Sequence, residues 1–376
     1  MKKYMSIAMA AVLASLSLSA CGGESKEQVE IENEDVALSA QEESVESAET
    51  AESAEEAEAA VDAESGKKLK IVTTIFPEYD WVKQIVGENN ENVQIEMLLD
   101  NGVDLHSYQP TAEDVMNISD CDMFIYVGGE SDEWVDDALK EKVNDDMVVL
   151  NLLEIMGDSV KEEEVVEGME AEEEEHEHGD AEDEDSEEHE DGEEEEEVEY
   201  DEHVWLSLKN AATICNKIAE SLETIDLDNA ETHKNNAASY TERLLALDSE
   251  YAAAVSAADK DTVLFGDRFP FRYMVDDYNL NYYAAFVGCS AETEASFETI
   301  VFLSGKVDEL GLGTVLTIEG DNHKIAETII QNTTGKDQNI RVMDSMQSTT
   351  SGDVENGASY LVIMEDNLEV LKEALK

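Results

Sequence analysis

The sequence predicts an α/β protein built of two Rossmann-like lobes with mainly parallel sheets, joined by a long backbone helix. Short apolar segments rich in β-branched residues alternate with helical patterns, as in βαβ units, and this alternation occurs twice. Between the two occurrences, residues 229–258 form a helical pattern without Gly or Pro. Ligands of open parallel sheets bind at the carboxyl ends of strands, so a ligand site is expected in the cleft between the lobes.

The first lobe begins with the β-branched strand 70–75, and Pro77 opens a helix because proline is tolerated in the first helical turn. Thr111 and Asp114 resemble a capping box at the start of another helix. The remaining elements of this half are expected as strands at 93–99, 122–127 and 147–153, and as helices at 132–143 and 207–222.

The alternation resumes after the long helix. Strands are expected at 262–265, 282–287, 314–318 and 340–344, and helices at 269–278, 297–310, 325–333 and 360–375. We therefore assign the N-terminal lobe to 68–228, the linking helix to 229–258 and the C-terminal lobe to 259–376.

The N-terminus has the features of a secretory signal that ends in a lipobox. Lys2 and Lys3 precede an apolar stretch at 5–18, and Leu-Ser-Ala leads directly into Cys21. The stretch is shorter than the ~20 residues that a membrane-spanning helix needs, which argues against an uncleaved anchor. We expect residues 1–20 to be removed, Cys21 to carry the lipid, and the protein to be extracytoplasmic and anchored to the cell membrane.

Two acidic segments account for most of the net charge of −70. Residues 21–67 are expected to form a disordered stalk, because they lack an apolar face. Residues 158–202 are expected to form a flexible loop, in which His176, His178 and His189 lie among carboxylates. Two interpretations of this loop stay open, a solvated spacer and an accessory metal-binding loop. Such acidity argues against nucleic acid as a partner, because phosphate contacts need Lys and Arg.

Three residues outside this loop are candidate metal ligands. His106 lies in NGVDLHSYQPT after a predicted strand, and His203 lies in DEHVWLSL between the acidic loop and a helix. Asp344 ends the predicted strand at 340–344. A single histidine in such a loop is commonly structural, and an Asp there commonly forms a turn. Two histidines at equivalent loop positions, beside a His-bearing loop, favour a divalent metal.

The chain resembles the zinc/manganese solute-binding lipoproteins of ABC importers, the ZnuA-like family of cluster A-I. The resemblance rests on GVDLHSYQPTAEDV, DEHVWLSLKNA and RVMDSMQSTTSGDVENGASYLVIMEDNLEVL, and it extends over 69–376. It implies two lobes with a backbone helix, one metal ion held between them, and delivery of that ion to a membrane permease. We also expect a monomer without enzymatic activity. By this resemblance the first ligand is His106, the second His203 and the last Asp344, and the long His/acid loop indicates the zinc branch.

The sequence departs from the family at the third ligand, which the resemblance places on Gly266. Asp267 is the neighbouring candidate, although Arg268 could engage its carboxylate. Two other interpretations are a solvent molecule and a residue from the loop around 289–292. A Cys289 thiolate there would favour zinc over manganese, but we favour an unreactive buried thiol. Glu319 is a candidate for orienting a ligand from outside the site.

Two imidazoles with one or two carboxylates suit Zn²⁺, whereas Mn²⁺ prefers more oxygens, so Zn²⁺ is the expected ligand and Mn²⁺ the alternative. A surface adhesin is a further alternative. A metallohydrolase is disfavoured because the sequence has no H-E-x-x-H or G-x-S-x-G motif. Cys121, Cys215 and Cys289 form no metal-binding spacing, and the sequence leaves open one disulfide or three thiols.

Overall fold

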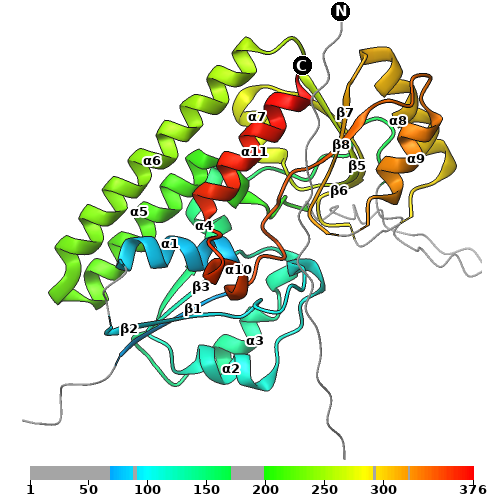
Figure 1. Cartoon of the computed structure of the whole chain (residues 1–376). Helices are drawn as coiled ribbons and strands as arrows, with labels where there is room; N and C mark the ends of the chain where they lie inside the picture. The colour runs from blue at the N-terminus through cyan, green and yellow to red at the C-terminus, as the bar shows by residue number, and fades with distance from the viewer. Residues whose placement is uncertain (1–67, 88–90, 171–198, 291–293, 321) are drawn as a thin grey trace, which may run out of the picture. The chain divides into compact units, whose positions relative to one another are not determined.

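The computed structural model describes residues 68–87, 91–170, 199–290, 294–320 and 322–376 (Figure 1). In this part of the chain the strands form two parallel four-stranded sheets, ordered β2-β1-β3-β4 and β6-β5-β7-β8. The predicted α/β class with two parallel sheets is therefore confirmed. The predicted signal, stalk and lipidated Cys21 lie outside the described residues, as do His176, His178 and His189.

The first sheet is centred on β1 (Leu69–Thr73), which pairs with β2 (Val93–Met97) and β3 (Met123–Tyr126), while β3 pairs with β4 (Val148–Asn151). Its β-branched residues Ile71 and Val72 are fully buried, which explains why this run forms the central strand. The helices of this half are α1 (Phe76–Val86), α2 (Ala112–Ser119), α3 (Val135–Lys140) and α4 (Leu152–Met156).

Two of the expected features of this half differ in outcome. The capping box at α2 is present, since the Thr111 hydroxyl accepts from the Asp114 amide and the Asp114 carboxylate accepts from the Thr111 amide. The expected helix at 132–143 is shorter, because residues Glu130–Asp132 form a separate 3₁₀ turn, η2, before α3 begins. This turn matters below because it carries Ser131.

The second sheet contains β5 (Thr262–Phe269), β6 (Asn281–Val287), β7 (Thr314–Thr317) and β8 (Asn339–Val342). Its helices are α7 (Arg272–Tyr278), α8 (Phe297–Leu310), α9 (Lys324–Asn332) and the short α10 (Ser351–Glu355). The expected strand end at 265 and helix start at 269 are wrong, because β5 continues to Phe269 through a register shift against β6 and α7 begins only at Arg272. The rings of Phe265 and Phe269 pack edge to face across this irregular stretch of the strand. Asp267 and Arg268 therefore lie on a strand.

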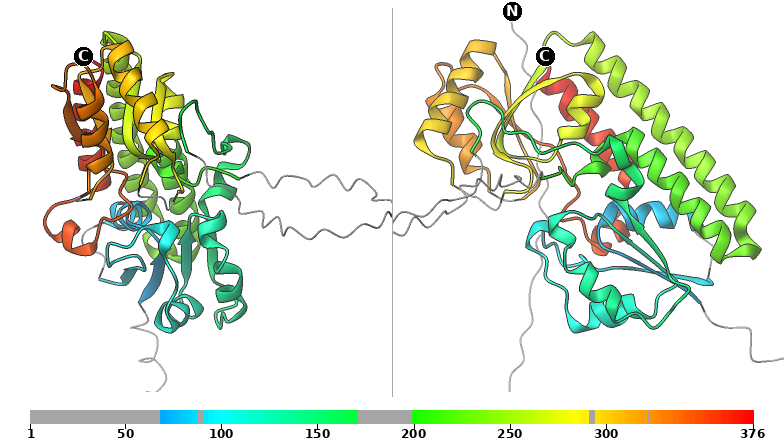
Figure 2. Two further views of the ribbon diagram at one scale, coloured as in Figure 1. Left: turned by 90° about the vertical axis from the view of Figure 1, so that its right-hand side faces the viewer. Right: turned by 180° about the vertical axis from the view of Figure 1, so that it is seen from behind.

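Long helices connect the two sheets. Helix α6 (Ala230–Ala257) has 28 residues and packs along α5 (Leu208–Ile225), as Figures 1 and 2 show. The last helix, α11 (Tyr360–Ala374), returns to the first half of the chain. The Tyr360 amide donates to Asp80, and its hydroxyl donates to the Trp205 carbonyl at 2.6 Å. A continuous hydrophobic core consequently includes residues from both sheets, and a smaller cluster lies around α8 and α9.

Among the described residues, no helix is both long enough and apolar enough to span a bilayer. The three cysteines of this part, Cys121, Cys215 and Cys289, are all free thiols. Of the two interpretations left open for them, the structure therefore shows the three thiols.

Candidate metal centre

Two histidines that are far apart in the sequence meet in the structure. His106 lies in the 3₁₀ turn η1 (Leu105–Ser107) after β2, and His203 directly precedes the 3₁₀ turn η4 (Val204–Leu206) that leads into α5. Their Nε2 atoms are 3.1 Å apart, and their ring centroids are 5.1 Å apart. His203 is fully buried, and the side chain of His106 is 8% exposed. Two almost fully buried imidazoles thus direct their Nε2 atoms at each other.

Both histidines are held by the same local device. The backbone amide of His106 donates to Asp104 at 3.0 Å, and that of His203 donates to Asp201 at 2.9 Å. An aspartate that accepts from the amide two residues later forms an Asx-turn, which fixes the direction of the following side chain. The repeated pattern Asp-x-His was the signal in the sequence for these two aspartates, which our sequence analysis missed.

Each imidazole also has a partner for its other ring nitrogen. The Nδ1 atom of His203 lies 3.0 Å from the Asp201 carboxylate, and that of His106 lies 2.7 Å from the Ser131 hydroxyl. A carboxylate oxygen of Glu202 lies 3.5 Å from His106 Nδ1 as well. Because Asp201 accepts only, a neutral His203 carries its proton on Nδ1, which leaves a lone pair on Nε2. Metal-binding histidines in proteins are oriented in this way.

The two imidazoles differ in their affinity for protons. Burial and the neighbouring His203 lower the pKa of His106 to about 3. Burial acts in the same direction on His203, but the Asp201 carboxylate outweighs it and raises the pKa of His203 above its ordinary value. His106 is therefore neutral at any physiological pH, whereas His203 keeps its proton to a higher pH than an ordinary imidazole does.

A third donor approaches from the second sheet. Cys289 follows β6, and its thiol sulfur and the two histidine nitrogens all lie within 4.8 Å of one another. No other trio or larger set of His, Cys, Asp or Glu donors is this close anywhere in the described ranges. Burial raises the pKa of the Cys289 thiol, and the nearby Asp201 and Glu202 carboxylates act in the same direction. From the sequence, the loop around 289–292 is one possible source of the third ligand, and our preference for an unreactive Cys289 stays a prediction.

The turn before Cys289 is close to His203 because residue 288 has no side chain. A Cβ atom on Gly288 would lie 2.9 Å from His203 Cε1 and 3.0 Å from the Phe269 carbonyl oxygen. Glycine at this position therefore allows the end of β6 to pack on the imidazole.

The predicted third-ligand region is occupied differently. A Cβ atom on Gly266 would lie 2.6 Å from Ala326 in α9, so position 266 faces that helix. The Asp267 carboxylate accepts from the backbone amides of Arg268 and Ile318 at 2.9 and 3.2 Å. The structure leaves Asp267 outside the donor group, and its role as a ligand stays a prediction.

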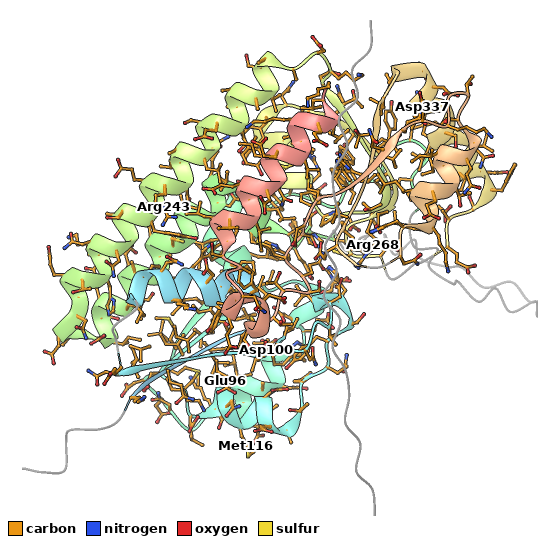
Figure 3. The ribbon with its side chains drawn as sticks, viewed as in Figure 1. Glu96, Asp100, Met116, Arg243, Arg268 and Asp337 are labelled. Carbon is orange, nitrogen blue, oxygen red and sulfur yellow. The ribbon has the colours of Figure 1, made fainter. Side chains whose placement is uncertain are left out.

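The guanidinium of Arg268, labelled in Figure 3, does not take Asp267 as its ion-pair partner. It binds Asp104 at 2.6 Å and donates to the Ser290 carbonyl at 3.3 Å. Burial opposes ionisation of Asp104, but Arg268 outweighs it and lowers the pKa of that carboxyl. An ion pair between the two halves of the chain thus lies directly beside His106 and Cys289.

Asp344 also lies outside the donor group. Its carboxylate accepts from the Met346 amide at 2.7 Å, and burial together with the charge of Glu319 raises its pKa to about 7. Glu319 accepts from the Ser345 amide and hydroxyl, both at 2.7 Å, and from the Gln347 amide. Glu319 therefore organises the loop after Asp344, while its predicted role in orienting a ligand stays untested, as does the role of Asp344 itself.

Comparison with known proteins identifies the family. The family model described as ZnuA, zinc-uptake complex component A periplasmic, matches residues 71–374. The chain belongs to the ZnuA family. The resemblance seen in the sequence is thereby confirmed, and the family's description makes its members transport components found outside the cytoplasm.

Individual relatives of this ZnuA-family chain agree. The zinc-binding lipoprotein AdcA of Streptococcus pneumoniae is 31% identical, with 81% of this chain and 56% of AdcA aligned. The high-affinity zinc uptake system protein ZnuA of Bacillus subtilis is 29% identical over 82% of this chain and 88% of its own length. The crystal structure of the Zn(II)-bound ZnuA-like domain of AdcA has a TM-score of 0.60, 27% identity, and covers 82% of this chain and 99% of that domain. This chain spans only about half the length of the AdcA relatives.

Proposed function

We propose that this protein is the extracytoplasmic Zn²⁺-binding component of an ABC importer, which delivers the ion to a membrane permease. The observation that supports it is the pair of buried Nε2 atoms of His106 and His203, 3.1 Å apart. Two nitrogens at ~2.0–2.1 Å from a tetrahedral zinc ion are separated by about 3.3 Å. The pair therefore already has nearly the spacing that a bound zinc ion requires.

The donor types favour zinc over manganese. Imidazole nitrogens suit Zn²⁺, whereas Mn²⁺ prefers carboxylate, carbonyl and water oxygens in larger coordination shells. The names of the relatives, which are zinc-binding or zinc-uptake proteins, support the same choice. Mn²⁺ remains the alternative against which the site is tested.

The lipid anchor on Cys21 belongs to this proposal. A protein that serves a membrane permease gains from being held at the membrane surface, since tethering raises its effective concentration there. Transport by a monomer is the simplest arrangement, because both histidines come from one chain.

The test is a zinc titration of the protein against a competing chromophoric chelator. We expect one tight site, and we expect the double variant His106→Ala/His203→Ala to lose it. His323→Ala is the matched control, because this histidine stands at the N-cap position of α9 without a side-chain capping hydrogen bond and lies outside the donor group. Trp205 offers a second readout, since its ring centroid is 5.1 Å from that of His203. Tight binding that survives in the double variant would overturn the proposal.

Deleting residues 171–198 separates this function from a surface adhesin that acts through the acidic loop. Glu170 bonds to Ala285 and Ser296, whereas Glu199 accepts from Glu163, so a short Gly/Ser linker joins the two ends and keeps these contacts. An importer component keeps its single tight site without the loop, whereas a protein that works through the loop loses its binding. Loss of the tight site on deletion would contradict our assignment of the site to His106 and His203.

A further inference from the structure

We propose that Cys289 is the third zinc ligand, so that the site is a two-histidine, one-thiolate centre. This inference rests on the proposed function and deepens it. Imidazole nitrogens bind several divalent metals, so the type of the third donor decides which metal the site prefers. The thiol is the one His, Cys, Asp or Glu donor in the described ranges that completes a group of three with the two histidines.

The position of the thiol follows from the fold. Strand β6 pairs with β5 up to Phe269 and Val287, and the chain then turns at Gly288 against the His203 ring. The Cys289 amide donates to Glu163 at 3.4 Å, and the Ser290 carbonyl accepts from Arg268. The residues on both sides of the thiol are thus held in place, and its sulfur points toward the imidazole pair.

The distances permit coordination after a small movement. With Zn–S near 2.3 Å and Zn–N near 2.0–2.1 Å, a tetrahedral site separates sulfur and nitrogen by about 3.6 Å. The present separations do not exceed 4.8 Å. Because Cys289 lies in a turn and is only partly buried, a shift on the order of 1 Å closes this difference without disturbing a strand.

The carboxylates that the sequence suggested for this role are used elsewhere. Asp267 and Asp344 accept hydrogen bonds from backbone amides. Asp104, which lies near His106, is paired with Arg268. The Arg268 guanidinium also brings a positive charge beside the site. An anionic ligand offsets this charge when a divalent ion binds, and a thiolate supplies that anion.

The binding step is a proton exchange without redox chemistry. Zn²⁺ takes the sulfur lone pair, the S–H bond breaks, and the proton passes to solvent. A Zn–S bond remains, and the zinc ion together with its thiolate carries a charge of +1. A divalent metal deprotonates a coordinating thiol even where the free thiol holds its proton firmly. Sulfur favours Zn²⁺, and also Co²⁺ and Cd²⁺ as probes, over Mn²⁺.

The experiment replaces zinc with Co²⁺ in the full-length protein and records the absorption spectrum. Thiolate coordination gives an intense sulfur-to-cobalt charge-transfer band in the near ultraviolet, whereas nitrogen and oxygen ligands give none. We expect this band in the wild-type protein and its loss in Cys289→Ser. We also expect zinc affinity to fall on the order of 10²-fold in this variant, with a smaller preference for zinc over manganese.

Two control variants account for the other thiols. Cys121→Ala and Cys215→Ala each remove a buried thiol outside the donor group, so both variants keep the band. If Cys289→Ser does not fold, the wild-type protein still answers the question. Zinc then protects Cys289 from alkylation by iodoacetamide, as measured by peptide mass spectrometry, while Cys215 is unaffected by zinc.

Three results distinguish the two proposals. Tight zinc binding by the wild-type protein without a cobalt charge-transfer band overturns the thiolate ligand alone. An unchanged band or unchanged zinc affinity in Cys289→Ser does the same. Absence of any tight site in the wild-type protein overturns the proposed function, independently of Cys289.

Discussion

The first half of the chain and the second sheet both gather polar side chains, but the first half directs two imidazole nitrogens at one another, whereas the second sheet gathers carboxylates. In the first half, Asp201 and Ser131 engage the Nδ1 atoms of His203 and His106 and leave both Nε2 atoms directed at one another. In the second sheet, the carboxylates accept from backbone amides instead: Asp267 from Arg268 and Ile318, Asp344 from Met346, and Glu319 from Ser345.

The difference shows that the type of a residue is not enough to make it a metal ligand; its hydrogen-bond partners in the fold also decide. An aspartate after a strand can coordinate a metal or satisfy the backbone amides that the end of the sheet leaves unpaired. In the second sheet the carboxylates accept hydrogen bonds from backbone amides, and the donor that approaches the histidines is the Cys289 thiol. Backbone amides make little use of a thiol, because sulfur is a weak acceptor.

Exchanging one residue in each region tests the comparison most directly. His203→Ala removes a donor and should lower zinc affinity on the order of 10²-fold or more. Asp344→Asn keeps an oxygen for the Met346 amide and removes the repulsion from Glu319, so zinc affinity should change less than about 3-fold. Chelator competition measures both. An equal loss in the two variants would mean that Asp344 belongs to the site.

The pH dependence of zinc affinity is the next largest effect. The pKa of His203 is raised, so below that pKa zinc must displace a proton from Nε2, and affinity falls as the pH is lowered. The pKa of His106, at about 3, adds nothing near neutrality. Because the pKa of the Cys289 thiol is also raised, zinc binding releases one proton from this thiol at every physiological pH.

As the pH is lowered, zinc affinity should therefore fall about tenfold per pH unit in the range above the pKa of His203, and about a hundredfold per pH unit in the range below it. In Cys289→Ser each slope should lose one factor of ten. Competition titrations between pH 5.5 and 8, corrected for the protonation of the chelator, measure these slopes. A response that is flat over this range in the wild-type protein is incompatible with His203 as a ligand.

Two glycines give the smallest effect and separate packing from binding. Gly266→Ala places a Cβ atom against the Ala326 backbone and should destabilise the fold by about 1–3 kcal/mol, with little change in zinc affinity. Gly288→Ala pushes on the His203 ring and should weaken zinc binding about tenfold, with a smaller change in melting temperature. Thermal melts and zinc titrations on both variants measure the contrast. It disappears if both variants lose stability and affinity to the same degree.

Local patterns in the sequence were sufficient for much of the fold. The alternation of β-branched runs and helical segments predicted both sheets, because burial of apolar residues sets the period of each element. The ends of strands and helices were predicted less accurately where aromatic rings pack across a turn. Strand β5 continues to Phe269, whose ring stacks on Tyr282 of β6, and α7 starts only afterwards; no short window relates these two rings.

The sequence by itself determined the α/β class, the long helix and the two histidines, since strand-end loops and residue chemistry are local properties. It also contained the Asp-x-His pattern that orients both rings. Only the tertiary structure decided which donor joins them. Strand register and the missing Cβ atom of Gly288 bring Cys289 to the imidazole pair, while backbone amides occupy Asp267 and Asp344. Both outcomes depend on contacts between distant segments, which exist only once the chain has folded.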